Sequence, residues 1–169
     1  LFNLAWYESM FWDGRATTIE DQVFHPVRDI HEMNLTWQKA VERLNKNVYY
    51  KQTFTKVFGA VQIDSSLVSK AIGQFLRTLI SNNSKFDKVL RRETVLTKQE
   101  HDGFVLMNEQ HKGNCLHCHT TDANALGTIG GFSNNGLDSI GESDAFIDPG
   151  LGAHSGIRGD YGKFKIPSL

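Results

Sequence analysis

The stretch Cys115-Leu116-His117-Cys118-His119 contains the pattern Cys-x-x-Cys-His. At this spacing the two thiols can add to the two vinyl groups of a haem, and the histidine that follows can ligate the iron. The chain has 169 residues and only these two cysteines, which argues against a framework of structural disulfides. The pattern therefore predicts covalent haem c, attached through Cys115 and Cys118, with His119 as an axial ligand of the iron.

Two other uses of the cysteine pair stay open on the residues alone. A structural zinc site could recruit His111 or His117 beside the motif, although such sites usually draw a second ligand pair from a separate segment. No such pair follows at the usual spacing, and His154 stands alone. A thioredoxin-like redox pair would open a helix after a strand, in a βαβ pattern that this sequence lacks. Haem is the favoured ligand.

The composition limits the partners of the chain. The net charge is −1, and the lysines and arginines are scattered among acids, which is typical of a solvated surface and not of nucleic-acid binding. The longest apolar stretches are far too short to span a membrane. Haem is attached to thiols outside the bacterial cytoplasm, so the motif predicts a periplasmic protein.

Hydrophobic spacing predicts a mainly α-helical fold. We expect a first helix that is capped by Thr17 or Thr18 and broken at Pro26. The apolar stripe of residues 65–80 is wide, which predicts a long and largely buried helix. Other helices are expected from Thr36 through Leu44, over 49–58 with an end at Gly59, and from a capping box at 97–100 to Gly113.

The remaining segments are predicted to be less regular. The polar stretch 85–97 reads as a connection between domains. Residues 127–162 include ten glycines without a helical period, which favours irregular loops packed around a ligand. Asn134-Asn135-Gly136 is a turn signal. The fold class expected is mainly α, with cytochrome c-like helical domains and long irregular Gly-rich loops.

Several separated motifs resemble one family, the bacterial di-haem cytochrome c peroxidases, nearly from end to end. Phe11-Trp12-Asp13-Gly14-Arg15, then Ile19-Glu20-Asp21-Gln22, Pro26 and Glu32-Met33, resemble the segment after the family's first haem. Residues 71–79 and 83–87 resemble its long helix and the exit from it, and 113–119 its second attachment site. Residues 132–138 and 162–169 resemble its later loops.

The resemblance implies a role for particular residues. Family members carry an N-terminal haem that reacts with peroxide and a C-terminal haem that receives electrons. Cys115, Cys118 and His119 correspond to the C-terminal haem. Glu32 and Gln22 correspond to the distal side of the peroxide-reacting haem, where a carboxylate moves protons and an amide orients peroxide. Trp12 corresponds to the tryptophan between the haems, an electron relay. Arg15 could brace Asp13 or pair with a haem propionate.

The resemblance also implies a function for the whole protein. It would reduce hydrogen peroxide to water with electrons from a small cytochrome or cupredoxin. Family members often form homodimers with calcium near the domain junction, and the loop around Pro167 is the expected place. Two rivals remain: a maturation-type di-haem oxidase that acts on a protein side chain, and a non-enzymatic electron-transfer cytochrome.

The chain departs from the family pattern at both ends. Only one attachment motif is present, so we expect the first motif before Leu1 and treat 1–92 as the remainder of the N-terminal domain. Residues 93–169 would be a truncated C-terminal domain whose sixth iron ligand lies beyond Leu169. None of Met10, Met33 and Met107 sits where that ligand is expected. The expected fragment alone should be inactive, with water or His154 as a substitute ligand.

Overall fold

The computed structural model describes residues 2–119, 131–137 and 146–167. The chain divides into two compact units, one formed by Ala16–Thr78 and the other by Leu1–Arg15 together with Leu79–Leu169. Each unit is described by itself. The predicted boundary near residue 92 concerns the two haem domains of the whole protein and stays a prediction. Among the described residues no helix is long and apolar enough to cross a membrane.

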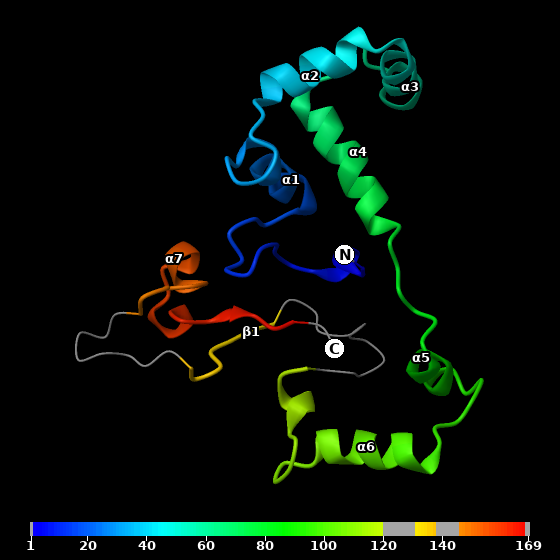
Figure 1. Ribbon diagram of the computed structural model, residues 1–169, viewed down its shortest axis with the longest axis vertical. Helices are drawn as coiled ribbons and strands as arrows, with labels where there is room; N and C mark the ends of the chain where they lie inside the picture. Colours follow the sequence, from blue (N-terminus) through cyan, green and yellow to red (C-terminus); the bar gives the residue numbers. More distant parts are fainter. Residues whose placement is uncertain (1, 120–130, 138–145, 168–169) are drawn as a thin grey trace. The chain divides into compact units, whose positions relative to one another are not determined.

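The unit 16–78 consists of helices with side-chain caps. Its helices are α1 (Ile19–Arg28), α2 (Trp37–Lys46), α3 (Val48–Phe58) and α4 (Ser65–Arg77) (Figure 1). The caps are Thr18, Thr36, Asn47 and Asp64, and each side chain accepts a backbone N–H of the first turn. Such caps satisfy donors that the helix leaves unpaired. The helices expected after Thr36 and before Gly59 are confirmed.

The core of this unit lies where α1 packs along α4. Ile19, Val23 and Val27 lie on one face of α1 and are buried. On α4 the buried residues are the small Ser69 and Gly73, which allow the close approach. The two terminal guanidinium nitrogens of Arg77 donate to the Glu20 carboxylate, at 2.6 and 2.9 Å, and link the two helices. Figure 1 shows α4 starting beside α2 and running along α1.

Two expectations about these helices are wrong. Pro26 does not break α1, because it lies in the last turn, where only one internal hydrogen bond is lost. The N–H of Asp29 still donates to the His25 carbonyl at 3.0 Å and closes the helix beyond it. The helix α4 ends at Arg77, and it is less buried than its apolar stripe predicts: Phe75 is 61% exposed. Small residues occupy its crossing with α1, so the large apolar ones point elsewhere.

The second unit contains short elements. They are η1 (Leu4–Trp6), α5 (Lys85–Leu90), α6 (Lys98–Asn108), η2 (Cys115–His117), β1 (Phe132–Ser133), α7 (Gly152–Ser155), η3 (Arg158–Asp160) and β2 (Phe164–Lys165). The predicted capping box of Thr97 and Glu100 is confirmed. The stretch 85–97 is not only a connection, because a second capping box of Ser84 and Asp87 opens α5 within it. The helix α6 ends at Asn108 and not at Gly113.

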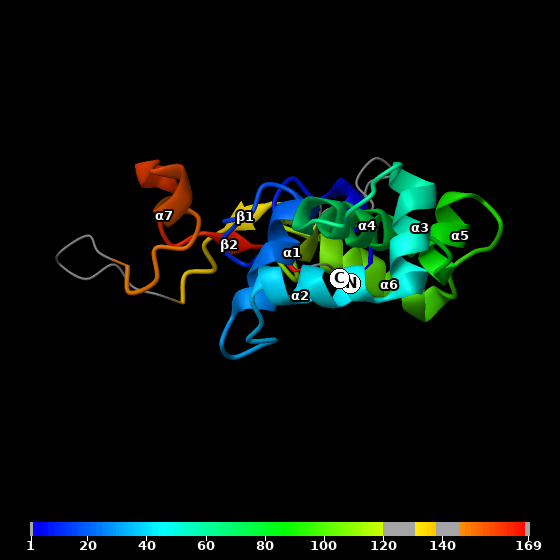
Figure 2. The same ribbon diagram turned by 90° about the horizontal axis from the view of Figure 1, so that it is seen from above.

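The late loops are joined by a small sheet. The strands β1 and β2 pair antiparallel, with Phe132 opposite Lys165, and lie side by side in Figure 2. The predicted turn at 134–136 is confirmed: Gly136 has a φ of 75°, and its N–H donates to Asn134 Oδ1 at 2.7 Å. The described parts of the Gly-rich region are mostly irregular, as expected, but they include the short elements β1, α7 and η3. Residues 127–130 and 138–145 lie outside the described residues.

Candidate functional site

The Cys-x-x-Cys-His motif forms one tight turn after α6. The backbone N–H groups of Cys118 and His119 both donate to the Cys115 carbonyl, at 3.2 and 2.9 Å. Gly113 lets this turn pack on the end of α6, because a Cβ there would lie 2.8 Å from the Leu106 carbonyl oxygen. Both thiols are free and half-buried. The motif therefore presents two reactive sulfurs and an imidazole from a single turn, as covalent haem attachment requires.

His119 supplies an independent test of the fit to haem. Its Nδ1 atom is buried and has no hydrogen-bond partner among the described residues. A buried polar group without a partner costs about 1–3 kcal/mol. Iron ligation would employ one ring nitrogen of His119 and fix the ring so that the other can donate a hydrogen bond. The residues present thus fit a haem, whereas the described residues offer no group of three or more ligands placed for a zinc ion.

Trp12 lies on a sharp turn of residues 11–14. Phe11 and Gly14 have positive φ angles of 69° and 75°, and the Gly14 N–H donates to the Phe11 carbonyl at 3.4 Å. A side chain at Gly14 would be strained and would also meet the Phe132 ring at 2.8 Å. The carbonyl of Trp12 accepts the Lys165 N–H at 2.7 Å, while its indole is exposed. The turn therefore presents an exposed aromatic ring on a fixed backbone.

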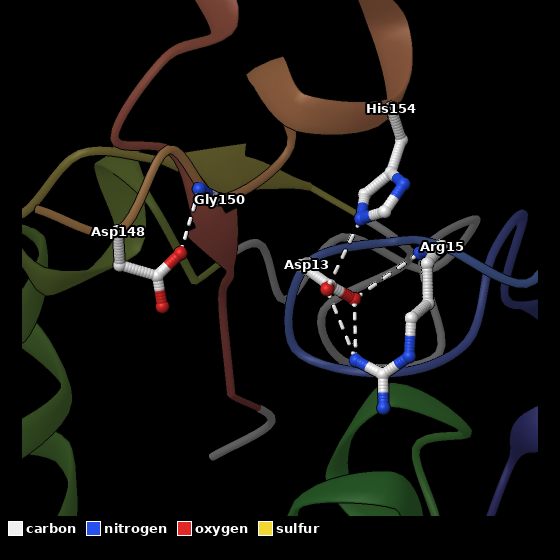
Figure 3. Close-up of polar contacts among 5 residues, drawn as sticks. All are labelled: Asp13, Arg15, Asp148, Gly150 and His154. Carbon is white, nitrogen blue, oxygen red and sulfur yellow. Dashed lines mark hydrogen bonds and ion pairs between the residues drawn. The ribbon is translucent and has the colours of Figure 1, made fainter. Parts of the chain in front are cut away.

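Asp13 is the centre of a polar cluster in this turn (Figure 3). Its carboxylate accepts the Arg15 backbone N–H at 3.2 Å and the Arg15 guanidinium at 2.9 and 3.0 Å. His154 Nε2 lies 3.2 Å from Asp13 Oδ2. Burial raises the pKa of Asp13, but the hydrogen bonds from Arg15 and His154 outweigh it and hold the pKa below its usual value. Asp13 is therefore an anion at neutral pH.

The cluster shows what Arg15 and His154 contact within the protein. Arg15 braces Asp13, which is one of its two expected roles, and its guanidinium lies over the Phe11 ring, 3.6 Å from the ring centroid. Its pairing with a haem propionate stays a prediction. His154, which the sequence suggests only as a substitute iron ligand, contacts Asp13. The sequence around His154 does not indicate this contact, because Asp13 lies 141 positions away in the chain.

Gln22 and Glu32 both belong to the unit 16–78. Gln22 is half-buried on α1, and Glu32 is exposed in the loop that follows this helix. The Asp29 carbonyl accepts the N–H groups of Glu32 and Asn34, at 3.2 and 2.9 Å, and the Asp29 carboxylate accepts that of His31 at 2.8 Å. The backbone at Glu32 is thereby fixed to the end of α1, which carries Gln22. Their proton-transfer and orienting roles stay predictions.

Comparisons with known proteins agree on one family. A family model described as di-haem cytochrome c peroxidase matches residues 1–95. The methylamine utilization protein MauG of Methylophilus methylotrophus is 32% identical over the whole chain and 48% of its own length. The cytochrome c551 peroxidase of Nitrosomonas europaea is 31% identical over 95% of the chain and 46% of its own length.

A solved structure extends this agreement to the fold. The crystal structure of a MauG-like protein associated with microbial copper homeostasis has a TM-score of 0.77 and 26% identity, over 99% of this chain and 53% of the other. The chain spans about half the length of the curated relatives that it matches. The predicted resemblance and the cytochrome c-like helical fold class are confirmed. The chain belongs to the di-haem cytochrome c peroxidase family, which includes the MauG proteins.

Proposed function

We propose that this chain is part of a periplasmic peroxidase that reduces hydrogen peroxide to two waters, taking up two protons and two electrons. The observation that carries the proposal is the attachment turn of residues 115–119. Its two free thiols and His119, whose Nδ1 has no partner among the described residues, fit a haem in a chain of this family. A small cytochrome or cupredoxin would supply the electrons. A homodimer and a calcium ion near Pro167 belong to the same proposal.

The attachment turn is proposed to hold the electron-receiving haem. Cys115 and Cys118 would form its two thioether bonds, and His119 would be its axial ligand on one side. A bound haem supplies an iron that accepts and passes on single electrons. The turn contributes placement, since the backbone hydrogen bonds to the Cys115 carbonyl fix the backbone of His119 relative to that of both cysteines. The family's other haem, the N-terminal one that reacts with peroxide, has no attachment motif in this chain, which holds only one pair of cysteines.

Glu32 and Gln22 are proposed to handle peroxide. An exposed carboxylate can accept a proton from one peroxide oxygen and deliver it to the other, so that water can leave. Glu32 suits this task because its backbone is fixed by Asp29 while its carboxylate is open to solvent. The Gln22 amide has both a donor and an acceptor with which to orient peroxide. Trp12 would relay electrons between the two haems.

The MauG relatives favour a second candidate. MauG of Methylophilus methylotrophus and the peroxidase of Nitrosomonas europaea are about equally similar to this chain, at 32% and 31% identity. The full-length protein could therefore be a maturation-type oxidase that acts on a protein side chain. The sixth ligand of the electron-receiving haem separates the two, because a methionine favours the peroxidase and a tyrosine favours the oxidase.

The test is peroxide-dependent oxidation of a reduced cytochrome by the full-length holoprotein, followed optically. We expect turnover, and we expect Glu32→Gln to lower kcat about 100- to 10,000-fold, the usual contribution of a general acid–base. Glu42→Gln is the matched control, because Glu42 is an exposed carboxylate of the same unit that pairs with Lys46. Absence of turnover in the wild type would refute the peroxidase and leave the oxidase or an electron-transfer cytochrome. Equal rates for wild type and Glu32→Gln would refute the role of Glu32.

A further inference from the structure

The turn that carries Trp12 is attached to distant parts of its own unit at three successive residues. The Trp12 carbonyl is bound by the backbone of Lys165 on β2. The Asp13 carboxylate is bound by His154 on α7. Gly14 lies against Phe132 and Leu151. The first of these attachments holds the chain at the carbonyl of Trp12, and the other two fix the direction in which the turn continues.

The indole of Trp12 has no comparable support from its own unit. It is 61% exposed, and among the described residues no hydrogen bond of its ring nitrogen is found. The direction of the ring therefore depends on the backbone of the turn. Asp13 links this backbone to the side chains of Arg15 and His154. Its own side chain is only 22% exposed and contacts both of them. Figure 3 shows the two partners approaching the carboxylate from different chain segments.

We infer that Asp13, linked to His154 of α7, is a positioning residue for Trp12 and holds its indole in the orientation required for electron relay. This inference rests on the relay role proposed above. Electron transfer depends on the placement of the relay, and a displacement of about 1 Å in a positioned group can cost about 100-fold in rate. His154 acts through Asp13, the residue that its ring contacts.

Fluorine NMR of the full-length holoprotein labelled with 5-fluorotryptophan tests the inference. The Trp12 resonance is assigned by its loss in Trp12→Phe. We expect His154→Ala to shift or broaden this resonance and to lower peroxide turnover about 10- to 100-fold. His154→Gln keeps a hydrogen-bond donor for Asp13, so it should restore both the wild-type resonance and turnover. His101→Ala is the matched control, an exposed histidine of the same unit on α6, and should change neither.

The outcomes separate this inference from the proposed function. If Trp12→Phe turns over like the wild type, the relay role fails, and the inference fails with it. If Trp12→Phe is impaired but His154→Ala leaves both the resonance and turnover unchanged, the relay stands and the positioning role of Asp13 is overturned. Should His154→Ala lose haem or fold poorly, His154→Gln decides: failure of this hydrogen-bonding variant to restore the wild-type resonance overturns the link.

Discussion

At the scale of single residues, the two thiols of the attachment turn give the most direct prediction, which concerns the number of attached haems. We expect the double change Cys115→Ala and Cys118→Ala to remove one of two haems from the full-length protein, because covalent attachment needs these sulfurs. Intact mass under denaturing conditions counts the attached haems. His117→Ala, a change between the cysteines at an exposed side chain, should keep both. An unchanged haem count in the double variant would contradict the attachment site.

The same scale shows what residue types can and cannot predict. The attachment motif is local, so five consecutive residues predict both the ligand and its anchors. The contact of Asp13 with His154 joins residues 141 positions apart, and neither side chain is unusual where it stands in the sequence. Only the pairing of the late loops with the turn, through Lys165 and the Trp12 carbonyl, brings them together. Such contacts depend on the tertiary fold and leave no pattern in a single sequence.

At the scale of elements, the ion pair of Glu20 and Arg77 joins α1 to α4. Hydrogen bonding to Arg77 lowers the pKa of Glu20, and burial opposes this only in part. A lowered pKa in the folded state means that the pair stabilises the fold above the ordinary pKa of glutamate and that this stabilisation is lost as pH falls through the lowered value. A double-mutant cycle of Glu20→Gln and Arg77→Gln should give a coupling of about 0.5–1 kcal/mol at pH 7, since both groups are partly solvated.

Chemical denaturation of the four proteins of this cycle at pH 7 and at pH 3 measures the coupling. It should be smaller at pH 3. The exposed pair Glu42 and Lys46 on α2 is the matched control and should show a weaker coupling. A coupling that does not respond to pH would show that packing of α1 on α4 through the buried Gly73, and not the charges, holds the two helices.

The start of α6 offers a second prediction at this scale. A hydrogen bond from Lys85, followed by those from Thr97, lowers the pKa of Glu100 to about 2. The stabilisation by ionised Glu100 is therefore complete above the ordinary pKa of glutamate and lost only as pH falls toward 2. We expect Thr97→Ala to destabilise the protein by about 1 kcal/mol in thermal unfolding. Thr53→Ala, a change within α3 at a hydroxyl that donates to the Tyr49 carbonyl and takes no part in a cap, should cost less.

The elements also show why helix prediction from sequence succeeds in part. Caps and capping boxes are local, so the start of α2 at Thr36 and of α6 at Thr97 could be predicted. The burial of α4 could not, because its stripe contains large apolar residues and the small Ser69 and Gly73 alike. The distance between the axes of α1 and α4 decides whether the large or the small residues of α4 contact α1. Pro26 did not mark the end of α1 correctly, because it lies in the last turn and the helix ends two residues after it.

At the scale of the whole molecule, the division into two compact units predicts a local response to haem. A ligand stabilises the part of a protein that binds it, and the attachment turn lies entirely in the unit that contains residues 79–169. In the double cysteine variant we expect faster amide hydrogen exchange in α6 and in residues 146–167. Exchange in α1 and α4 should stay as in the wild type, because their core of Ile19, Val23 and Val27 belongs to the other unit. Equal loss of protection in both units would show that the chain unfolds as one cooperative body.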